Sequence, residues 1–275
     1  MALNDEIRRE QAKLQGQPFK VKFAYFWDYY KIHTIVAFCI IVAVAWTAYD
    51  MITAMDTAVG AYVLNAAGAD EELAAAYMRE FEQAYGVDTA KEEVYLSTTQ
   101  YLTPGANRDN YDYAALQKIV AEQAAGEMDF TAMDLWNFNS YVQSGMFADL
   151  REIFSEEELA RMDEKYGLYY VDMQEIREEA ERREDVEYIT KMEVESTAEA
   201  NESELLSNFT LPDPSGMRDP APVGVWINST ELVTEAHFYD GITAIGGIVV
   251  NTKRMEPAKA FFQWLLFGAE AIARQ

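Results

Sequence analysis

Cysteine and histidine are almost absent from this chain of 275 residues, which has one cysteine and two histidines. Cys39 has no second cysteine for an intramolecular disulfide, and it lies in an apolar run, so it indicates no redox compartment. His33 and His237 are isolated, and neither has a second histidine at the spacing of a metal site. The sequence therefore predicts neither a disulfide framework nor a metal centre.

Motifs of the common enzyme classes are also missing. The sequence has no glycine-rich phosphate loop, no Gly-x-Ser-x-Gly elbow and no His-Glu-x-x-His motif. His237, Tyr239 and Asp240 stand close together but lack the further partner that a catalytic triad needs. The acidic segment 107–113 lacks the glycine and distal glutamate of an EF-hand calcium loop. We therefore expect a protein that is not an enzyme and uses no cofactor.

Positive charge is scarce, because 22 basic residues stand against 47 acidic ones and the formal net charge is −25. Nucleic acids and anionic lipid surfaces are themselves polyanions, so this charge disfavours non-specific binding to either. Half of the residues are hydrophobic, which is enough to bury a core. The composition leaves neutral ligands, cations and basic partners, and it predicts no nucleic-acid partner.

One long apolar run stands near the N-terminus. Residues 32–49 read IHTIVAFCIIVAVAWTAY, and a weaker apolar stretch continues past Asp50. A helix of that length spans most of a bilayer core, which is about 30 Å thick, at a rise of about 1.5 Å per residue. A buried helix of a soluble domain is the alternative. We expect a transmembrane signal anchor over residues 32–54, with the lipid bilayer as its partner.

The flanks of the run predict its orientation. Six basic residues precede it, whereas the first fifty residues after it contain two. Basic residues remain on the cytoplasmic side, so residues 1–31 are predicted to be a cytoplasmic segment, basic and aromatic, and 56–275 an extracytoplasmic domain. A cleaved signal peptide is the competing interpretation, but the basic region is long and AWTAYDM is a poor cleavage site. The predicted location is the cell membrane, with a single pass.

Strand-like and helix-like stretches alternate in the first part of the outer domain. β-Branched and apolar runs predict strands at 58–66, 93–101 and 128–136. The stretches 70–86 and 111–126 between them have apolar residues at helical spacing and glycine at the end. This order is typical of right-handed βαβ units, so it predicts an α/β domain with a parallel sheet.

The second part of the outer domain changes in composition. Residues 175–220 are charged and then rich in Glu, Ser, Asn and Pro, which predicts an exposed helix followed by a partly flexible insertion. Further strands are predicted at 222–230 and at 242–252, the latter broken at its Gly246–Gly247 pair. A helix that starts at Glu256–Pro257 closes the domain. Shorter predicted elements are an acidic helix at 155–167 and a strand at 168–173.

Polar and aromatic residues follow the predicted strands at the ends where parallel α/β sheets bind ligands. Such residues suit stacking against a sugar or peptide and hydrogen bonding to its polar groups. Alternatively, the residues after the third strand form a helix start in which Asn137 or Asn139 caps free N–H groups and Trp136 packs inward. The predicted ligand-binding residues are Trp136, Asn137, Asn139 and Tyr141, then Thr98, Gln100 and Tyr101, and finally Tyr239.

Three segments carry a resemblance to a known family. The stretch GEMDFTAMDLWNFNSYVQSGMFADLREIF resembles the segment of extracellular solute-binding proteins, of the type 2 periplasmic-binding fold, in which a strand ending in an acidic residue leads into a helix. PVGVWINST and NTKRMEPAKAFFQWLLF are similar to the late strand of that family and to the helix that follows. The resemblance implies capture of a small solute by a reduced, membrane-anchored member.

The predicted function is therefore a membrane-anchored, extracytoplasmic solute-binding-like protein. It would present a small ligand, such as a sugar, an amino acid or a peptide, to a transporter or sensor in the membrane. The alternative is a cell-surface interaction or accessory subunit of a membrane complex that kept the fold without ligand binding. The two interpretations differ in whether the strand ends form a polar pocket or an apolar contact surface.

Overall fold

The computed structural model describes residues 18–53, 55–66, 68–103, 110–183 and 209–272. Within this part the chain divides into two compact units, Met1–Ala54 and Met55–Gln275. Residues 184–208 of the predicted insertion, and the first 17 residues of the predicted cytoplasmic segment, lie outside the described residues.

The described part of the first unit is one long helix, α2, Phe19–Thr53. Within it the stretch Tyr30–Met51 has 22 residues and a mean hydropathy of 2.0, and none of it is buried in the protein. At a rise of about 1.5 Å per residue such a stretch is about 33 Å long, enough to cross a bilayer core. The N-terminal helix is therefore long and apolar enough to span a membrane, as predicted.

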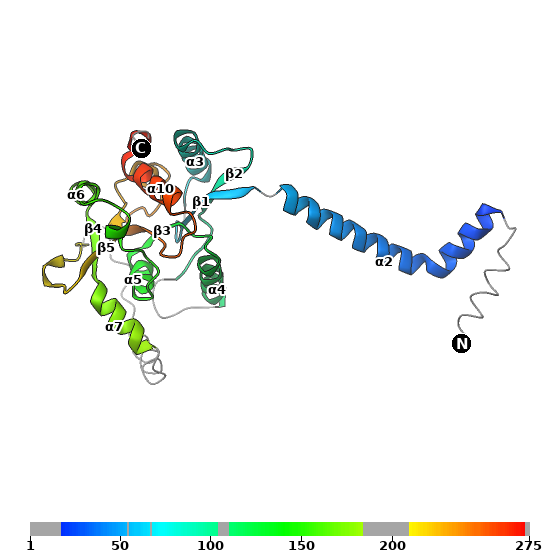
Figure 1. The fold of residues 1–275 in the computed structure, drawn as a ribbon, viewed down its shortest axis with the longest axis horizontal. Helices are drawn as coiled ribbons and strands as arrows, with labels where there is room; N and C mark the ends of the chain where they lie inside the picture. Colours follow the sequence, from blue (N-terminus) through cyan, green and yellow to red (C-terminus); the bar gives the residue numbers. More distant parts are fainter. Residues whose placement is uncertain (1–17, 54, 67, 104–109, 184–208, 273–275) are drawn as a thin grey trace. The chain divides into compact units, whose positions relative to one another are not determined.

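The second unit is built on a six-stranded mixed sheet in the order β2-β1-β3-β6-β5-β4 (Figure 1). β1 is parallel to both β2 and β3, as the alternation of strands and helices predicts. β6 is antiparallel to β3 and β5, and β4 is antiparallel to β5, so the prediction of a parallel sheet is wrong for this half. The strands are β1 Asp56–Val63, β2 Glu92–Ser97, β3 Phe130–Asp134, β4 Leu168–Asp172, β5 Pro220–Trp226 and β6 Ala244–Ile248.

A short connection explains why β6 reverses direction. The helix between β5 and β6 is α9, Glu231–Glu235, and its five residues span about 7.5 Å. The seven residues of β5 span about 23 Å, so α9 is too short to carry the chain back along the sheet as a parallel crossover requires. The chain therefore re-enters at the same edge and runs antiparallel to β5.

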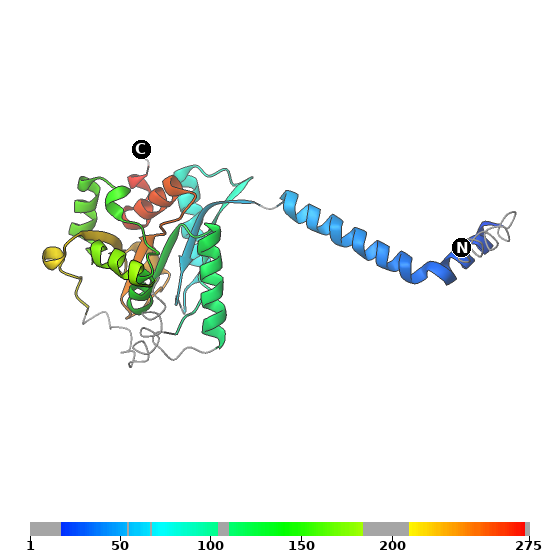
Figure 2. The same cartoon turned by 60° about the horizontal axis from the view of Figure 1, so that its bottom comes forward.

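Helices cover both faces of the sheet. Figure 1 and Figure 2 show α10 between α3 and α6 over one face, and α5 between α4 and α7 over the other. β2 and β3 flank β1 on opposite sides, so two right-handed crossovers place α3 and α4 on opposite faces. The helices are α3 Glu71–Tyr85, α4 Asn110–Ala125, α5 Leu135–Gln143, α6 Glu156–Lys165, α7 Met173–Arg183 and α10 Met255–Phe267, with short 3₁₀ turns η1 Leu150–Glu152, η3 Pro214–Gly216 and η4 Ala269–Ala271.

The ends of α3 and α6 lie where capping residues in the sequence predict them. Asp70 caps α3 by accepting the N–H of Leu73 at 3.0 Å, and Gly86 ends that helix with φ of +82°. Ser155 and Glu158 form a reciprocal capping box at the start of α6. These local interactions explain why the boundaries of α3 and α6 agree closely with the prediction from sequence.

The strands bury side chains on both faces. In the central strand β3, Phe130 and Ala132 pack in the core beneath α3 and α10, while Met133 packs in the core beneath α4 and α5. Every residue of β3 is buried, as expected for a strand covered on both sides. The aromatic rings of Phe130 and Phe261 lie 5.3 Å apart, which joins the sheet to α10.

Gly246 and Gly247 lie inside β6, so the predicted break at this pair is wrong. A Cβ atom on Gly246 would come within 2.8 Å of the Phe130 ring, and one on Gly247 within 2.6 Å of the Phe147 ring. The two glycines are therefore required by the close approach of aromatic side chains from both faces, and they leave the strand continuous.

A buried ion pair joins the start of β3 to the start of α10. Asp129 is fully buried, and its Oδ2 accepts from Arg254 Nε at 2.7 Å and from the Gly60 backbone N–H at 2.7 Å. The Thr252 hydroxyl donates to the other carboxylate oxygen. One carboxylate therefore connects β1, β3 and the chain that enters α10.

Ion pairs also join the two ends of the segment between β4 and β5. Arg218 binds Asp172 at 3.3 Å and Glu178 at 2.7 Å, and Arg151 binds Asp219 at 2.9 Å. The backbone N–H of Arg218, and also that of Asp219, donates to Asp172 and lowers the pKa of its carboxyl to about 2. The chain thus leaves β4 and returns to β5 through one cluster of charges.

The first prediction concerns the buried ion pair. Arg254→Met should lower the free energy of unfolding by about 3 kcal/mol, because it leaves the Asp129 carboxylate buried without its cation. Denaturant unfolding of the second unit measures the change, with Arg79→Met on the exposed surface of α3 as control. Equal effects of the two substitutions would refute this role of Arg254.

The second prediction concerns the glycine pair. Gly247→Ala should lower the free energy of unfolding by about 1–3 kcal/mol, because its Cβ would also lie 2.7 Å from the Val223 carbonyl oxygen. Gly216→Ala is the matched control, since nothing lies within 4 Å of a Cβ at that position. Urea titration should show a shifted midpoint for the first variant and almost none for the control. A neutral Gly247→Ala would show that the packing argument is wrong.

Candidate functional site

Four strands end at the same edge of the sheet. β1, β2, β3 and β5 share one direction, so their carboxyl ends lie together. In α/β sheets this edge is where ligands bind. Of the residues predicted from sequence, seven follow β2 or β3 and therefore belong to this edge, whereas Tyr239 follows α9.

Asn137 belongs to a hydrogen-bond network that joins three strand ends. It is fully buried, and its Nδ2 donates to Asp134 Oδ2 at 2.7 Å and to the Leu102 carbonyl at 3.2 Å. Asn65, after β1, donates to the same Asp134 oxygen at 2.7 Å and accepts the Leu102 N–H at 2.7 Å. The N-cap of α5 is Asp134, so the predicted caps Asn137 and Asn139 are both inside the helix.

The other predicted residues of α5 do not converge with Asn137. Trp136 is half-buried, and its indole Nε1 has no hydrogen-bond partner among the described residues. Asn139 is exposed and accepts the hydroxyl of Tyr169. Tyr141 is buried in the core beneath α4 and α5. The four side chains therefore have different surroundings. Asn137 is in the network, Asn139 contacts β4, Tyr141 is in the core, and Trp136 is half-buried.

The residues predicted after β2 have three different environments. Thr98 is half-buried in a groove of about 450 Å³ between α3 and the edge strand β2. Gln100 is buried, and its Nε2 donates to Glu122 of α4 at 2.7 Å. Tyr101 is 56% exposed. Contact of these residues with a ligand stays a prediction.

Tyr239 connects the turn after α9 to the centre of the sheet. It is buried with φ of +58°, and its hydroxyl lies 2.8 Å from the Ala132 carbonyl oxygen and also contacts that of Leu64. Burial raises the pKa of Tyr239 well above its usual value. The hydroxyl is therefore occupied by the ends of β1 and β3, and its predicted contact with a ligand is also untested.

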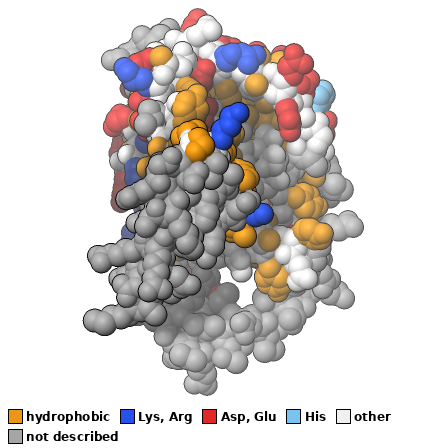
Figure 3. Space-filling model, turned by 90° about the vertical axis from the view of Figure 1, so that its right-hand side faces the viewer, with side chains coloured by type: hydrophobic (Ala, Val, Ile, Leu, Met, Phe, Trp, Pro, Cys, Tyr) orange, Lys and Arg blue, Asp and Glu red, His pale blue; other side chains and the backbone are white. Residues whose placement is uncertain are grey.

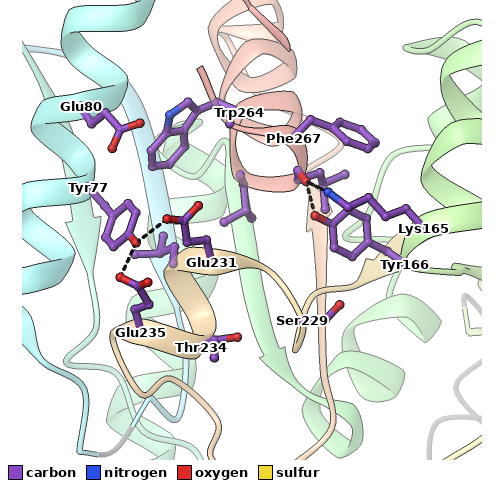
Figure 4. A pocket seen from close by; sticks show the side chains of 14 residues that line it. Tyr77, Glu80, Lys165, Tyr166, Ser229, Glu231, Thr234, Glu235, Trp264 and Phe267 are labelled. Carbon is purple, nitrogen blue, oxygen red and sulfur yellow. Dashed lines mark hydrogen bonds between the residues drawn. The ribbon is translucent and has the colours of Figure 1, made fainter. Parts of the chain in front are cut away.

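The sequence did not predict a cavity of about 420 Å³ at this edge, over the α3 and α10 face (Figure 4). It opens beside the carboxyl end of β5 and is bounded by α3, by α9 and by the C-terminal ends of α6 and α10. Three carboxylates and several aromatic rings line it. The lining includes Tyr77 and Glu80, Lys165 and Tyr166, Ser229, Glu231 and Glu235, and Trp264 and Phe267.

Tyr77 faces two carboxylates in this cavity. Its hydroxyl lies 2.7 Å from Glu235 Oε2 and 3.3 Å from Glu231 Oε1, as Figure 4 shows. Partial burial, together with the hydrogen bond to Glu235 and the nearby negative charge, raises the pKa of Tyr77 above its usual value. Since a hydroxyl has one proton to donate, one of the two carboxylates remains an open acceptor.

An aromatic wall lies opposite these carboxylates. Trp264 is 4% exposed, and its indole Nε1 is buried without a hydrogen-bond partner in the described part of the chain. Its ring meets that of Tyr77 edge to face at 6.3 Å, and in Figure 4 its nitrogen is turned toward Glu80. Buried polar groups normally have partners, so this N–H is an unsatisfied donor inside the wall of the cavity.

The sequence had one weak signal for this cavity. Glu231 and Glu235 are four residues apart on a short helix, a spacing at which like charges repel. The remaining lining residues come from segments separated by up to about 190 positions. Only the folded sheet brings these four segments together.

Within the described ranges, no group of three or more His, Cys, Asp or Glu side chains is arranged to hold a metal ion. No protein-family model, curated protein or solved structure matches the chain. The residues of the cavity and of the strand ends are therefore the features that bear on function.

The third prediction separates a structural from a ligand-binding role for Asn137. Asn137→Ala should lower the free energy of unfolding by about 1–3 kcal/mol, because Asp134 and the Leu102 carbonyl each lose a buried hydrogen-bond donor. Gln143→Ala, at an exposed position of the same helix, is the control and should change little. Chemical denaturation of both variants provides the comparison, and an Asn137→Ala variant as stable as the control would contradict a structural role.

Proposed function

We propose that this chain is a membrane-anchored, extracytoplasmic binding protein that captures a small polar solute and presents it to a transporter or sensor in the same membrane. The observation that carries the proposal is the cavity beside β5, in which carboxylates with open acceptor positions lie among aromatic rings. Its volume of about 420 Å³ is within the range of small-ligand pockets.

The fold supports this proposal. The first three strands form βαβ units, and the cavity opens at the edge to which their carboxyl ends point. The segments that resemble solute-binding proteins form β3 with α5, β5, and the chain from β6 into α10. We propose a reduced periplasmic-binding-like fold on these grounds.

The N-terminal unit supports the proposed location. The stretch Tyr30–Met51 is long and apolar enough to span a bilayer, and five of the six basic residues among the first 31 positions precede it. The positive-inside tendency then favours a cytoplasmic N-terminus and an extracytoplasmic outer domain. A tethered binding protein stays close to a membrane partner, which raises its effective concentration there.

A second candidate function is an accessory subunit that binds another protein. It is favoured by exposed aromatic and apolar side chains on the side of the outer unit that carries β2 and α4. Figure 3 shows hydrophobic side chains at the surface, interspersed with charged ones. Exposed apolar surface of this kind marks contact sites for other proteins. The exposed large hydrophobic residues in the described parts of β2, α4 and the chain between them are Tyr95, Tyr101, Tyr111, Tyr113 and Val120.

The fourth prediction tests solute capture. A panel of sugars, amino acids and short peptides should contain compounds that raise the melting temperature of the full chain in detergent micelles. A ligand at a hundred times its Kd stabilises the folded state by about 2.7 kcal/mol. Ser229→Phe, at an exposed position of the cavity wall, should remove this stabilisation because the ring fills the opening.

Ser215→Phe is the matched control, since that exposed serine lies in η3 and not in the cavity wall. It should keep the full ligand-induced shift. If no compound of the panel raises the melting temperature, solute capture is refuted and the accessory-subunit candidate takes its place. If both phenylalanine variants behave alike, the solute binds elsewhere.

A further inference from the structure

The charges around the cavity select among solutes. Glu80, Glu231 and Glu235 contribute three carboxylates, and none of them has an ion pair among the described residues. Lys165 is the single basic residue of the lining, and its Nζ points to the Leu266 carbonyl oxygen at 3.4 Å. The lining therefore has an excess of two negative charges that no side chain of the described part neutralises.

Two of these carboxylates favour a cationic solute because they lie close together. Glu231 and Glu235 lie on the same side of α9 and share the single proton of the Tyr77 hydroxyl. Like charges at this spacing repel, so a bound cation would relieve a repulsion that is built into the site. An ammonium group has donors and no acceptor, which suits an open carboxylate.

The aromatic rings add a second, independent requirement. Trp264 and Tyr77 present rings at the wall beside the carboxylates, and rings of these residue types attract cations. The far end of the cavity already holds one ammonium in this way, because Lys165 Nζ lies 4.8 Å from the Tyr166 ring and 5.2 Å from the Phe267 ring. A cationic group in the remaining space would have the same kind of environment.

Charge and aromatic surface in the cavity therefore favour the same chemical group. The carboxylates of Glu231 and Glu235 provide acceptors, and the rings of Tyr77 and Trp264 stand beside them. We infer that the solute of this cavity is a small organic ammonium ion.

This inference rests on the proposed function, and its test is the fifth prediction. Two pairs of probes differ in charge and hardly in shape: choline with 3,3-dimethylbutan-1-ol, and 3-aminopropan-1-ol with butan-1-ol. Calorimetric titration of the full chain in micelles should show that the charged member of each pair binds at least about tenfold more tightly. Ser229→Phe should abolish binding of the charged probes.

Two sets of variants test the contacts. Glu231→Gln/Glu235→Gln should lose at least about tenfold in affinity for choline, because both carboxylates become neutral amides. Glu156→Gln/Glu157→Gln changes the net charge equally at exposed positions of α6 and should bind normally. Tyr77→Phe should bind choline at least as tightly as the native chain, since it keeps the ring and frees a carboxylate. Circular dichroism checks that each variant folds.

The outcomes separate this inference from the proposed function. If neutral solutes bind through the cavity and charged probes gain nothing, solute capture stands and the ammonium inference is overturned. If the two double variants lose affinity equally, long-range charge and not the cavity attracts the probe, which also overturns it. If no solute of any class binds, the proposed function itself is refuted.

Discussion

The ion pair between Asp129 and Arg254 is the interaction on which the rest of the second unit depends. The Asp129 carboxylate is fully buried at the start of the central strand, where it receives a backbone N–H from β1 and the guanidinium of Arg254. Arg254 is also the residue from which α10 begins. Trp264 lies about 2.8 turns, or 15 Å, further along that helix. A charge pair at one edge of the sheet thereby sets the position of a cavity wall at the opposite edge.

Two groups of polar side chains lie at the edge of the sheet where β1, β2, β3 and β5 end. They differ in how far their hydrogen-bonding capacity is filled. In the network of Asn65, Asp134 and Asn137, each donor points to a partner within the chain, so the strand ends are held rigidly. In the cavity beside β5, two carboxylates share the hydroxyl of Tyr77 and the indole N–H of Trp264 is left over. Paired donors of this kind stabilise the fold, whereas the carboxylates of the cavity are left with free acceptor capacity.

The sequence predicts the elements of this domain better than their arrangement. Local signals determine α3 and α6, because Asp70, Gly86 and Ser155 act within one turn of their own helix. The direction of β6 depends on the length of α9, and the glycine pair depends on Phe130 and Phe147 packing against it from distant segments. Trp136 and Asn137 were placed correctly at a strand end, but periodicity cannot distinguish a side chain that faces a network from one that faces a cavity.

The charge cluster around Arg218 allows the segment between β4 and β5 to differ in length among related proteins. Because Asp172 and Arg218 hold the two ends of the intervening segment together, its length is decoupled from the pairing of β4 with β5. Each doubling of a loop with fixed ends costs only about 0.6 kcal/mol of closure entropy. Insertions there would be tolerated by the sheet, so this is the place where a related protein could acquire a second lobe without rebuilding its core.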